Sequence, residues 1–256
     1  MTGASYTAKL EHFKLETRNL KLIFMKDLFG KAILDYQTNN LPQDIITETN
    51  ISEADEMEVA YLFREFNSMP KLEQKALQLA KGKILDVGCG AGSHSLYLQE
   101  KGLDVTAIDV SPSAIKACEL RGVKNAKVQN VLDIENDKFD TILLLMNGTG
   151  IFGTLAATAT YLKKLKSLLA PNGQILIDSS DIIYMFDDAE DGSKWIPAEG
   201  YYGELTFTIS YKKETDTPFL WLYLDYNRLQ NAAQANGLEC ELIKEGEHFD
   251  YLAKLY

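Results

Sequence analysis

The sequence has few cysteines and no long apolar run. Its three cysteines, Cys89, Cys118 and Cys240, are scattered, odd in number and without a C-x-x-C spacing. This pattern argues against a disulfide framework or a structural zinc site, and it fits a reducing cytoplasm. No apolar run reaches the roughly 18 residues of a membrane-spanning helix, and the first residues lack the apolar core of a secretory signal. We therefore expect a cytoplasmic protein without a metal site and without a membrane partner.

Positive charge is also scarce. The chain has 26 Lys and Arg against 37 Asp and Glu, a net charge of −11 and a sequence pI of about 4.8. Such a chain repels phosphate backbones, and no cluster of Lys and Arg offsets this, so nucleic acid is not expected as a partner. The remaining composition is ordinary, and 256 residues allow one large α/β domain or one domain with a cap.

The first 82 residues predict an extension followed by a helical cap. Residues 1–24 carry no strong pattern, and the more regular stretch that begins at Met25 makes either Met1 or Met25 the physiological start. Residues 36–53 are polar and predict a loop. Helical spacing then predicts a helix over 53–67, which carries Tyr61 and Arg64. A second helix is expected from the capping signal at 68–70 to the stop at Gly82.

From Lys83 the pattern alternates between strands and helices. Five short apolar stretches predict strands at 84–87, 104–108, 127–131, 139–145 and 174–179, with helices over 93–101, from 111, and over 154–169. This alternation predicts a Rossmann-like, mostly parallel sheet flanked by helices. Later, 205–211 and 219–224 predict an antiparallel hairpin, and the chain ends with a helix over 227–236 and strands over 239–244 and 248–255. We expect an antiparallel terminal strand in this α/β fold.

A glycine-rich loop follows the first of these strands, in the segment KILDVGCGAGSHSLYL. Gly88 and Gly90 let the backbone turn sharply and approach a ligand, because no Cβ stands in the way. The helix that follows presents free N–H groups. Dinucleotides and S-adenosylmethionine both use such a loop. Asp86 favours S-adenosylmethionine over a dinucleotide. Its negative charge would face the negatively charged pyrophosphate of a dinucleotide, whereas S-adenosylmethionine offers a positively charged ammonium and sulfonium group.

Asp109 ends the next strand, in VTAIDVS. A carboxylate at this position can accept hydrogen bonds from both ribose hydroxyls. A dinucleotide enzyme would use the same contact, so Asp109 indicates a ribose without choosing the cofactor.

Five segments together resemble the class I S-adenosylmethionine-dependent methyltransferase family. They are ILDVGCGAG, AIDVS, VQNVLDI, FDTILLLMN and LLAPNGQILI, in the family's order. The resemblance covers about Lys83 to Asp181. Within the family, the sequence is similar to small, uncharacterised bacterial-type members. It implies an S-adenosylmethionine-binding domain over 83–256, with an inserted loop and hairpin at 183–224 that covers the active-site edge together with the cap at 1–82.

The resemblance also implies which residues bind S-adenosylmethionine and its product S-adenosylhomocysteine. The expected contacts are Asp86, Gly88, Cys89 and Gly90 for the methionyl and ribose part, Asp109, Val110 and Ser111 for the ribose and one adenine face, Asn130 and Val131 for the adenine edge, and Met146 beside the methyl group. Family members often have Asp where Asn130 stands, so Asp133 is an alternative owner of the adenine contact.

Methyl transfer asks little of side chains, because the sulfonium is already an activated leaving group and the protein mainly positions the acceptor. A general base is needed only for an acceptor with a proton to lose. Weak catalytic candidates are Asn147, Asp178 and His248. The competing interpretations are a turn at 147–150, including Thr149, a capping role for Asp181, and a surface histidine on an edge strand.

Other candidates have structural alternatives of similar or greater weight. His94 could line the methionyl pocket or simply pack, and Arg64 could pair with the cofactor carboxylate or remain solvated. Five aromatic residues could wall an acceptor site or form core: Trp195, Tyr201, Tyr202, Trp221 and Tyr223. The acidic run at 187–192 lacks the spacing of a calcium loop and is interpreted as a solvated loop.

The function predicted from the sequence is methyl transfer from S-adenosylmethionine to a small-molecule acceptor. Two alternatives remain open. A nicotinamide-dependent oxidoreductase would have to accept a pyrophosphate despite Asp86, and a non-catalytic protein would bind S-adenosylmethionine without turnover. The sequence indicates neither the acceptor atom nor the oligomeric state.

Overall fold

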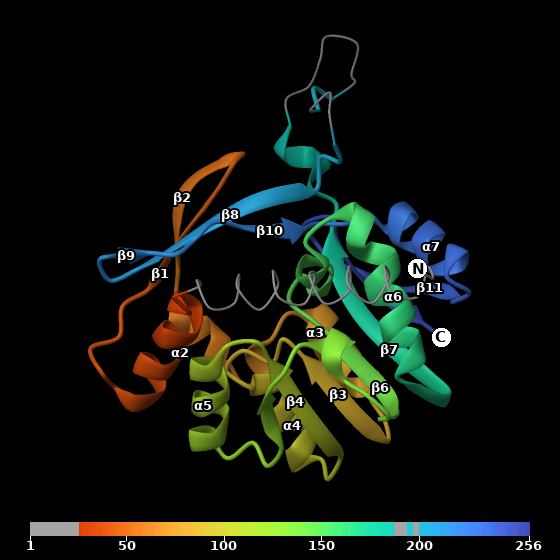
Figure 1. Cartoon of the computed structure of the whole chain (residues 1–256), viewed down its shortest axis with the longest axis horizontal. Coiled ribbons are helices and arrows are strands. Elements are labelled where there is room, and N and C mark those ends of the chain that lie inside the picture. Colours follow the sequence, from red (N-terminus) through yellow and green to blue (C-terminus); the bar gives the residue numbers. More distant parts are fainter. Residues whose placement is uncertain (1–25, 187–193, 197–199) are drawn as a thin grey trace, which may run out of the picture.

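The computed structural model describes residues 26–186, 194–196 and 200–256. Its centre is a seven-stranded sheet, here called the main sheet, with the order β11-β12-β7-β6-β3-β4-β5 (Figure 1). Its strands are β3 (Lys83–Val87), β4 (Asp104–Asp109), β5 (Ala126–Val128), β6 (Phe139–Leu144), β7 (Leu169–Ser180), β11 (Cys240–Glu245) and β12 (Asp250–Leu255). The first five are parallel, whereas β12 pairs antiparallel with β7 and with β11. This confirms the predicted fold class.

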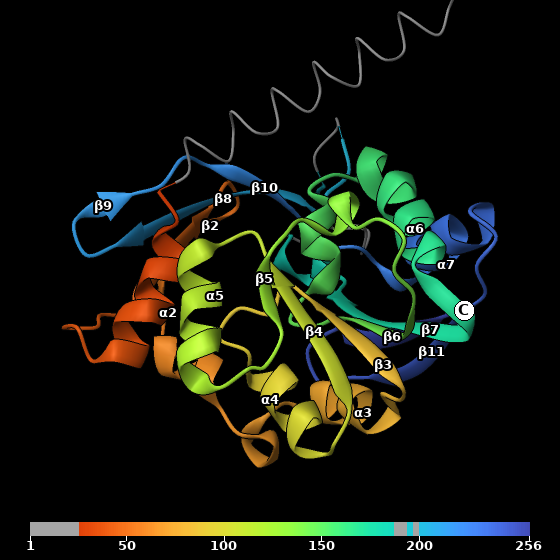
Figure 2. The same cartoon turned by 60° about the horizontal axis from the view of Figure 1, so that its bottom comes forward.

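Helices cover both faces of the main sheet (Figure 2). On one face, α3 (Lys71–Leu79) and α4 (Ser93–Glu100) pack on alternate strand residues such as Ile84 and Leu143. On the other face, α6 (Thr158–Ser167) and α7 (Tyr226–Ala235) pack on Leu85 and Ile142. The strands are apolar on both sides because both faces are buried, as expected of a parallel sheet.

A second, antiparallel sheet, here called the second sheet, joins a segment that precedes β3 to a segment that lies between β7 and β11 in the sequence (Figure 1). Its order is β10-β8-β1-β2, and β9 pairs with β8. The strands are β1 (Ile45–Thr49), β2 (Ser52–Met57), β8 (Glu204–Tyr211), β9 (Glu214–Thr215) and β10 (Phe219–Leu222). The predicted hairpin is therefore present as β8 and β10, paired from Phe219 with Phe207 to Leu222 with Glu204.

The predictions for residues 36–67 were confirmed for the loop at 39–44 and wrong for most of the remainder. The polar stretch and the first part of the expected helix form β1 and β2, and the rest forms the 3₁₀ helices η1 (Val59–Phe63) and η2 (Phe66–Ser68). The reason is long-range pairing, because β1 pairs with β8 and this contact overrides a weak helical spacing. Ahead of them, α2 (Leu28–Thr38) packs against Ile209 and Tyr211 of the second sheet.

Smaller differences concern element ends. Strand β5 stops at Val128 and is followed by η3 (Val131–Asp133), while α6 is preceded by η5 (Leu155–Ala157). The predicted start of α5 (Pro112–Arg121) is confirmed: Ser111 Oγ accepts from the Ala114 amide at 2.9 Å, with Pro112 in the first turn. Within the described ranges no helix is long and apolar enough to cross a membrane. The expectations for Met25 and for residues 187–192 lie outside the described residues.

Candidate functional site

The carboxyl ends of the parallel strands meet at one edge of the main sheet, where ligands bind in open α/β folds. This edge carries Asp86 from β3, Asp109 from β4, Asn130 after β5, Met146 after β6 and Asp178 near the end of β7. The topology therefore brings together predicted cofactor residues from separate sequence segments and the catalytic candidate Asp178.

The glycine loop turns at the end of β3. The amides of Gly88 and Cys89 both donate to Ile108 O, at 2.9 and 3.0 Å, which fastens the loop to β4. Gly90 has φ +52°, and a Cβ built there would meet no heavy atom within 4 Å. The left-handed backbone and the open space together leave the main chain accessible to a ligand at the start of α4.

Asp109 is held in place by the same loop. Its Oδ2 accepts from the Gly90 amide at 3.0 Å and its Oδ1 from the Ser111 amide at 2.9 Å. Each carboxylate oxygen keeps a further lone pair, so the group can still accept from two ribose hydroxyls. Burial raises the pKa of Asp109, while these N–H groups act to lower it. Val110 follows with 44% of its surface exposed, available to pack on a flat ring.

Asp86 and Cys89 turn away from the open space. Asp86 is 2% exposed, and its Oδ2 accepts from Ser95 Oγ of α4 at 2.6 Å. Cys89 Sγ lies 3.8 Å from Cys118 Sγ of α5, so its side chain points into the core and only its backbone lines the loop. The structure places both residues beside the predicted site, and direct contact of Asp86 with a cofactor stays a prediction.

The residues predicted to contact the adenine lie after β5. The Gln129 amide donates to Asp109 O at 2.8 Å, which places Asn130 next to Asp109. Asn130 Oδ1 accepts from the Leu132 amide and caps η3, while Val131 is buried. Asp133 lies exposed at the far end of η3. The geometry therefore favours Asn130 over Asp133 beside the ribose position.

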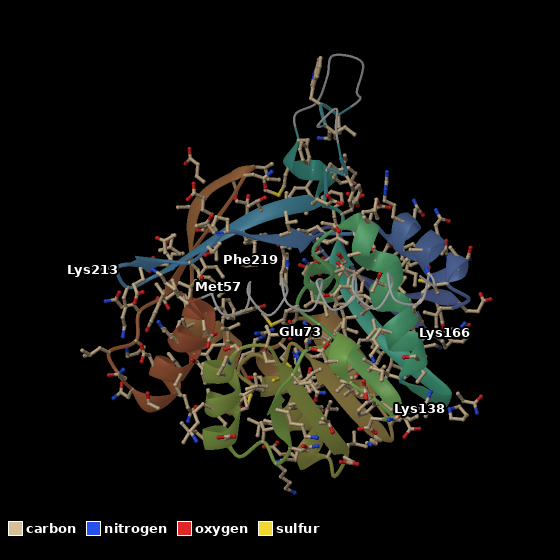
Figure 3. The ribbon with its side chains drawn as sticks, in the orientation of Figure 1. Met57, Glu73, Lys138, Lys166, Lys213 and Phe219 are labelled. Carbon is tan, nitrogen blue, oxygen red and sulfur yellow. The ribbon has the colours of Figure 1, made fainter. Side chains whose placement is uncertain are left out.

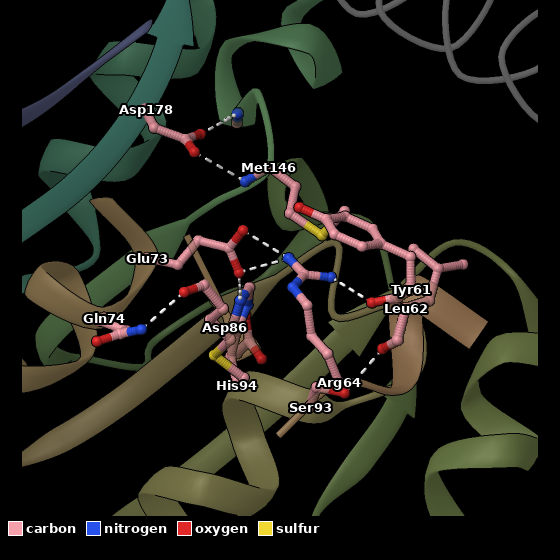
Figure 4. Close-up of polar contacts among 12 residues, drawn as sticks. Tyr61, Leu62, Arg64, Glu73, Gln74, Asp86, Ser93, His94, Met146 and Asp178 are labelled. Atoms are coloured by element: carbon pink, nitrogen blue, oxygen red, sulfur yellow. Dashed lines mark hydrogen bonds and ion pairs between the residues drawn. The ribbon is translucent and has the colours of Figure 1, made fainter. Parts of the chain in front are cut away.

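A buried ion network joins the segment after η1 to α3 and α4 (Figure 4). Arg64 Nη2 lies 2.5 and 2.6 Å from the two carboxylate oxygens of Glu73 on α3, and His94 Nε2 on α4 lies 2.6 Å from Glu73 Oε2. The Tyr61 ring covers the Arg64 guanidinium, with 3.9 Å from Cζ to the ring centroid. The expectation of a solvated arginine was wrong, since the Arg64 side chain is 6% exposed.

The network shifts the pKa values of its members. Burial alone would raise the pKa of Glu73, but the hydrogen bond and charge of His94 and the charge of Arg64 hold it below its ordinary value. Burial would lower the pKa of His94, yet its hydrogen bond to Glu73 and the charges of Asp86 and Glu73 raise it. Glu73 and His94 thus stabilise each other's charged forms.

One donor in this network is unsatisfied. Among the described residues, Arg64 Nε is the buried side-chain nitrogen or oxygen without a hydrogen-bond partner. A buried donor without a partner costs free energy and calls for an acceptor. Arg64 is one residue beyond η1, whose Leu62 carbonyl accepts from Ser93 Oγ at the start of α4. Contact of this N–H with the methionyl carboxylate of S-adenosylmethionine stays a prediction.

The segment after β6 is fixed by Asp178. Its Oδ1 accepts from the Gly148 amide at 2.8 Å and its Oδ2 from the Met146 amide at 3.0 Å (Figure 4). Met146 and Asn147 both have positive φ, 67° and 59°, and η4 (Gly148–Phe152) follows. Burial raises the pKa of Asp178 to about 7, against the effect of the two N–H groups. Asp178 therefore positions this turn.

Thr149 was expected in a flexible turn, and this was wrong. It is fully buried within η4, and its Oγ1 lies 2.6 Å from Ser179 Oγ and 3.0 Å from Leu222 O. Asn147 has the same partners, since its Nδ2 donates to Leu222 O and its Oδ1 accepts from Ser179 Oγ. These bonds connect the end of β6 to strand β10 of the second sheet.

The remaining polar candidates have structural positions. His248 lies exposed in the turn before β12, and its amide donates to Asp250 Oδ1. Asp181 caps η6 (Ile182–Met185) through the Ile183 amide and accepts from Tyr202 Oη, as its capping interpretation expected. Among the residues that the structure describes, no cluster of His, Cys, Asp and Glu could hold a metal ion.

The five predicted aromatic residues separate into different places. Tyr201 is buried with Asp225, and Trp195 is 71% exposed. Trp221 and Tyr223 lie on the second sheet, together with Phe207 and Phe219, which the sequence analysis did not select.

Glu73 was also missed by the sequence analysis. Its signal was an acidic residue in line with the apolar stripe of its helix, at the spacing of Ala76, Leu77 and Ala80.

Comparisons with known proteins agree on one family. A family model described as a methyltransferase domain matches residues 79–219. A solved structure of a SAM-dependent methyltransferase from Bacteroides fragilis, in complex with S-adenosyl-L-homocysteine, is 46% identical. It covers 90% of this chain and 94% of that chain with a TM-score of 0.84.

More distant matches share the fold or part of the sequence. CalS10, an amino pentose methyltransferase from Micromonospora echinaspora, is 15% identical, with a TM-score of 0.54 over 80% of this chain and 98% of that one. A ubiquinone biosynthesis O-methyltransferase from Xanthomonas euvesicatoria is 29% identical over 111 residues. That match spans 40% of this chain and 45% of the relative, so the chain covers less than half the length of this curated protein.

Proposed function

The chain belongs to the class I S-adenosylmethionine-dependent methyltransferase family, and we propose that it transfers the methyl group of S-adenosylmethionine to a small-molecule acceptor. The observation that carries the proposal is the arrangement of Asp109 against the glycine loop. Its two carboxylate oxygens are oriented by the Gly90 and Ser111 amides, and the space above Gly90 is open.

The residues at this edge fit the cofactor of the family. Asp109 would accept from the ribose hydroxyls, Val110 would pack on the adenine, and Asn130 would lie at its edge. Arg64 would donate its unsatisfied Nε–H to the methionyl carboxylate, which supplies the missing acceptor. Asp86 would act through Ser95, holding the first turn of α4 in place. When bound, the cofactor supplies a methyl group on a positively charged sulfur.

In the reaction, a lone pair of the acceptor forms a bond to the methyl carbon. The carbon–sulfur bond breaks, its electron pair goes to sulfur, and S-adenosylhomocysteine leaves. Any proton on the acceptor atom passes to solvent or to a base. The contribution of this chain is positioning: Asp178 fixes the amides of Met146 and Gly148, and the second sheet covers the edge through Asn147 and Thr149.

A small acceptor is supported by the second sheet and by the charge of the chain. The sheet lies across the edge at which the methyl group would sit (Figure 1), and the net charge of −11 disfavours nucleic acid. One curated relative is named for ubiquinone biosynthesis, but its match covers too little of either chain to supply an acceptor. The free cysteines of the described residues support a cytoplasmic location.

Calorimetric titration with S-adenosylmethionine, S-adenosylhomocysteine and NAD tests the proposal. We expect micromolar binding of the first two ligands, no binding of NAD, and loss of about tenfold or more in affinity in Asp109→Ala, since hydrogen bonds to a charged group contribute about 1.5–3 kcal/mol. Asp104→Asn, exposed at the other end of β4, is the matched control. Binding of NAD alone would favour an oxidoreductase. Cofactor binding without S-adenosylhomocysteine formation across an acceptor panel would favour a non-catalytic protein.

A further inference from the structure

Four aromatic side chains form a continuous group on one side of the second sheet, here called the aromatic face: Phe207, Phe219, Trp221 and Tyr223. Phe207 is central, with ring centroids 6.0 Å from Phe219, 6.4 Å from Trp221 and 6.3 Å from Tyr223. The Phe207 ring lies within 23° of parallel to both Phe219 and Tyr223. All four residues are only partly buried.

The aromatic face is turned toward the cofactor edge of the main sheet. Phe219 packs against the buried cluster that includes Leu28 of α2 and Ile209 of β8. The Trp221 indole lies against Gly150 of η4, only four residues after Met146. In Figure 3, Phe219 and Glu73 lie on opposite sides of the region between the two sheets. The face is therefore continuous with the place where the methyl group is expected.

The opposite side of the same strands carries mostly small polar residues instead of aromatic ones. It carries Thr206, Thr208 and Ser210 on β8 and the exposed Leu220 on β10. Aromatic side chains on one face of a sheet commonly serve packing, but packing alone would bury the rings. Partly exposed aromatic surface beside a reaction site is typical of ligand binding.

The charged groups near this face already have partners. Glu73 is neutralised by Arg64 and His94, and Asp178 accepts from two amides. Burial raises the pKa of Tyr223 to about 12, so its hydroxyl is neutral at physiological pH. Recognition at this face therefore depends on ring surface and on neutral polar groups, which suits an uncharged acceptor.

We propose that the methyl acceptor carries an aromatic ring, which stacks on the aromatic face, and that Phe207 determines this specificity. The proposal rests on the methyltransferase function above. Near-parallel rings offer a flat surface to a second ring, and an aromatic pair contributes about 0.5–1.5 kcal/mol beyond the area it buries. A protonated amine would also be attracted to the rings, but it has no lone pair to attack the methyl carbon.

The test compares phenol, catechol and 2-naphthol with cyclohexanol, cyclohexane-1,2-diol and decahydro-2-naphthol. Ligand-observed NMR with the full chain and saturating S-adenosylhomocysteine measures the affinity of each. We expect the aromatic member of each pair to bind about tenfold more tightly. Phe207→Leu should lower that preference about three- to tenfold. The matched control is Leu220→Ala, on the opposite face, which should keep the preference of the wild type.

Calorimetry with S-adenosylhomocysteine separates this proposal from the function on which it rests. Unchanged cofactor affinity in Phe207→Leu, together with weaker aromatic binding, supports the aromatic face. Failure of the wild type to bind S-adenosylhomocysteine would instead contradict the proposed function. The aromatic acceptor is refuted if no aromatic probe binds, if the saturated partners bind equally well, if Phe207→Leu keeps the preference, or if tetramethylammonium binds better than the phenols.

Discussion

Arg64 and Glu73 form an ion pair in the interior, with Arg64 Nη2 within 2.6 Å of both carboxylate oxygens and both side chains no more than 6% exposed. The pair connects the 3₁₀ segment before the main sheet to α3, and His94 extends it to α4. Charges buried to this degree are stable only when each is compensated.

Glu73→Gln should therefore be strongly destabilising. It leaves the Arg64 guanidinium buried without a counter-charge, and removal of one partner from a buried pair costs about 3–5 kcal/mol. Chemical denaturation measures the change in the free energy of unfolding. In the double variant Arg64→Met with Glu73→Gln the loss should be smaller than the sum of the single losses. Additive losses would show that the two side chains do not interact. Glu241→Gln, whose exposed carboxylate pairs with Lys254, is the control.

His94 should make the free energy of unfolding depend on pH above the ordinary pKa of histidine. Its pKa is raised in the folded protein, so its contribution is fully present below the ordinary histidine value of about 6.5 and is lost as pH rises through the folded pKa. The difference in unfolding free energy between wild type and His94→Gln should shrink from pH 6 to pH 9. A constant difference across this range would be incompatible with a charged His94.

Asp178 should make the free energy of unfolding depend on pH in the acidic and neutral range. Burial raises its pKa to about 7 in the folded state, so folding favours the protonated form and the contribution of this group to stability decreases as pH rises from about 4 to 7. Relative to Asp178→Asn, the wild type should lose about 2 kcal/mol between pH 5 and pH 8. Thermal and chemical unfolding at a series of pH values measures this. A flat difference would mean that the two amide hydrogen bonds keep the pKa near its ordinary value.

Gly150→Ala should loosen the attachment of the second sheet. A Cβ at Gly150 would overlap the rigid indole of Trp221, and overpacking of this kind costs about 1–3 kcal/mol. We expect a fall in Tm of a few degrees, about 2–4 °C per kcal/mol for a chain of this size. Adding Trp221→Leu should recover part of the loss, because the smaller side chain makes room. If the double variant were less stable than both single variants, the contact would not be the cause.

The parallel part of the main sheet, from β3 to β7, could be predicted because the sequence features that mark its elements are local. Ser111 and Pro112 begin α5, glycines end the neighbouring elements, and Asp86 and Asp109 stand at strand ends whose position follows from parallel topology. Each of these features is encoded within about ten residues of the place where it acts, so one sequence was enough.

The second sheet and the ion network could not be predicted in the same way. Strand β1 is half polar, and its partner β8 lies more than a hundred residues later, so nothing near it distinguishes it from a loop. Arg64, Glu73 and His94 come from three different elements. Their association depends on packing angles that no local pattern contains, although the acidic residue on the apolar stripe of α3 was visible.

The second sheet draws its strands from before β3 and from between β7 and β11 in the sequence, with Ile46 paired to Ser210. During synthesis, β1 and β2 leave the ribosome long before β8 and β10 exist, so the β1–β2 hairpin lacks its partner strand β8 while β3 to β7 emerge. The parallel strands β3 to β7 are thus made first, the second sheet is completed next, and α7, β11 and β12 follow. A chain stopped before Leu222 would carry Asp109 and the glycine loop but not a complete second sheet. The proposed cofactor residues and the proposed acceptor surface would therefore be made at different stages of synthesis.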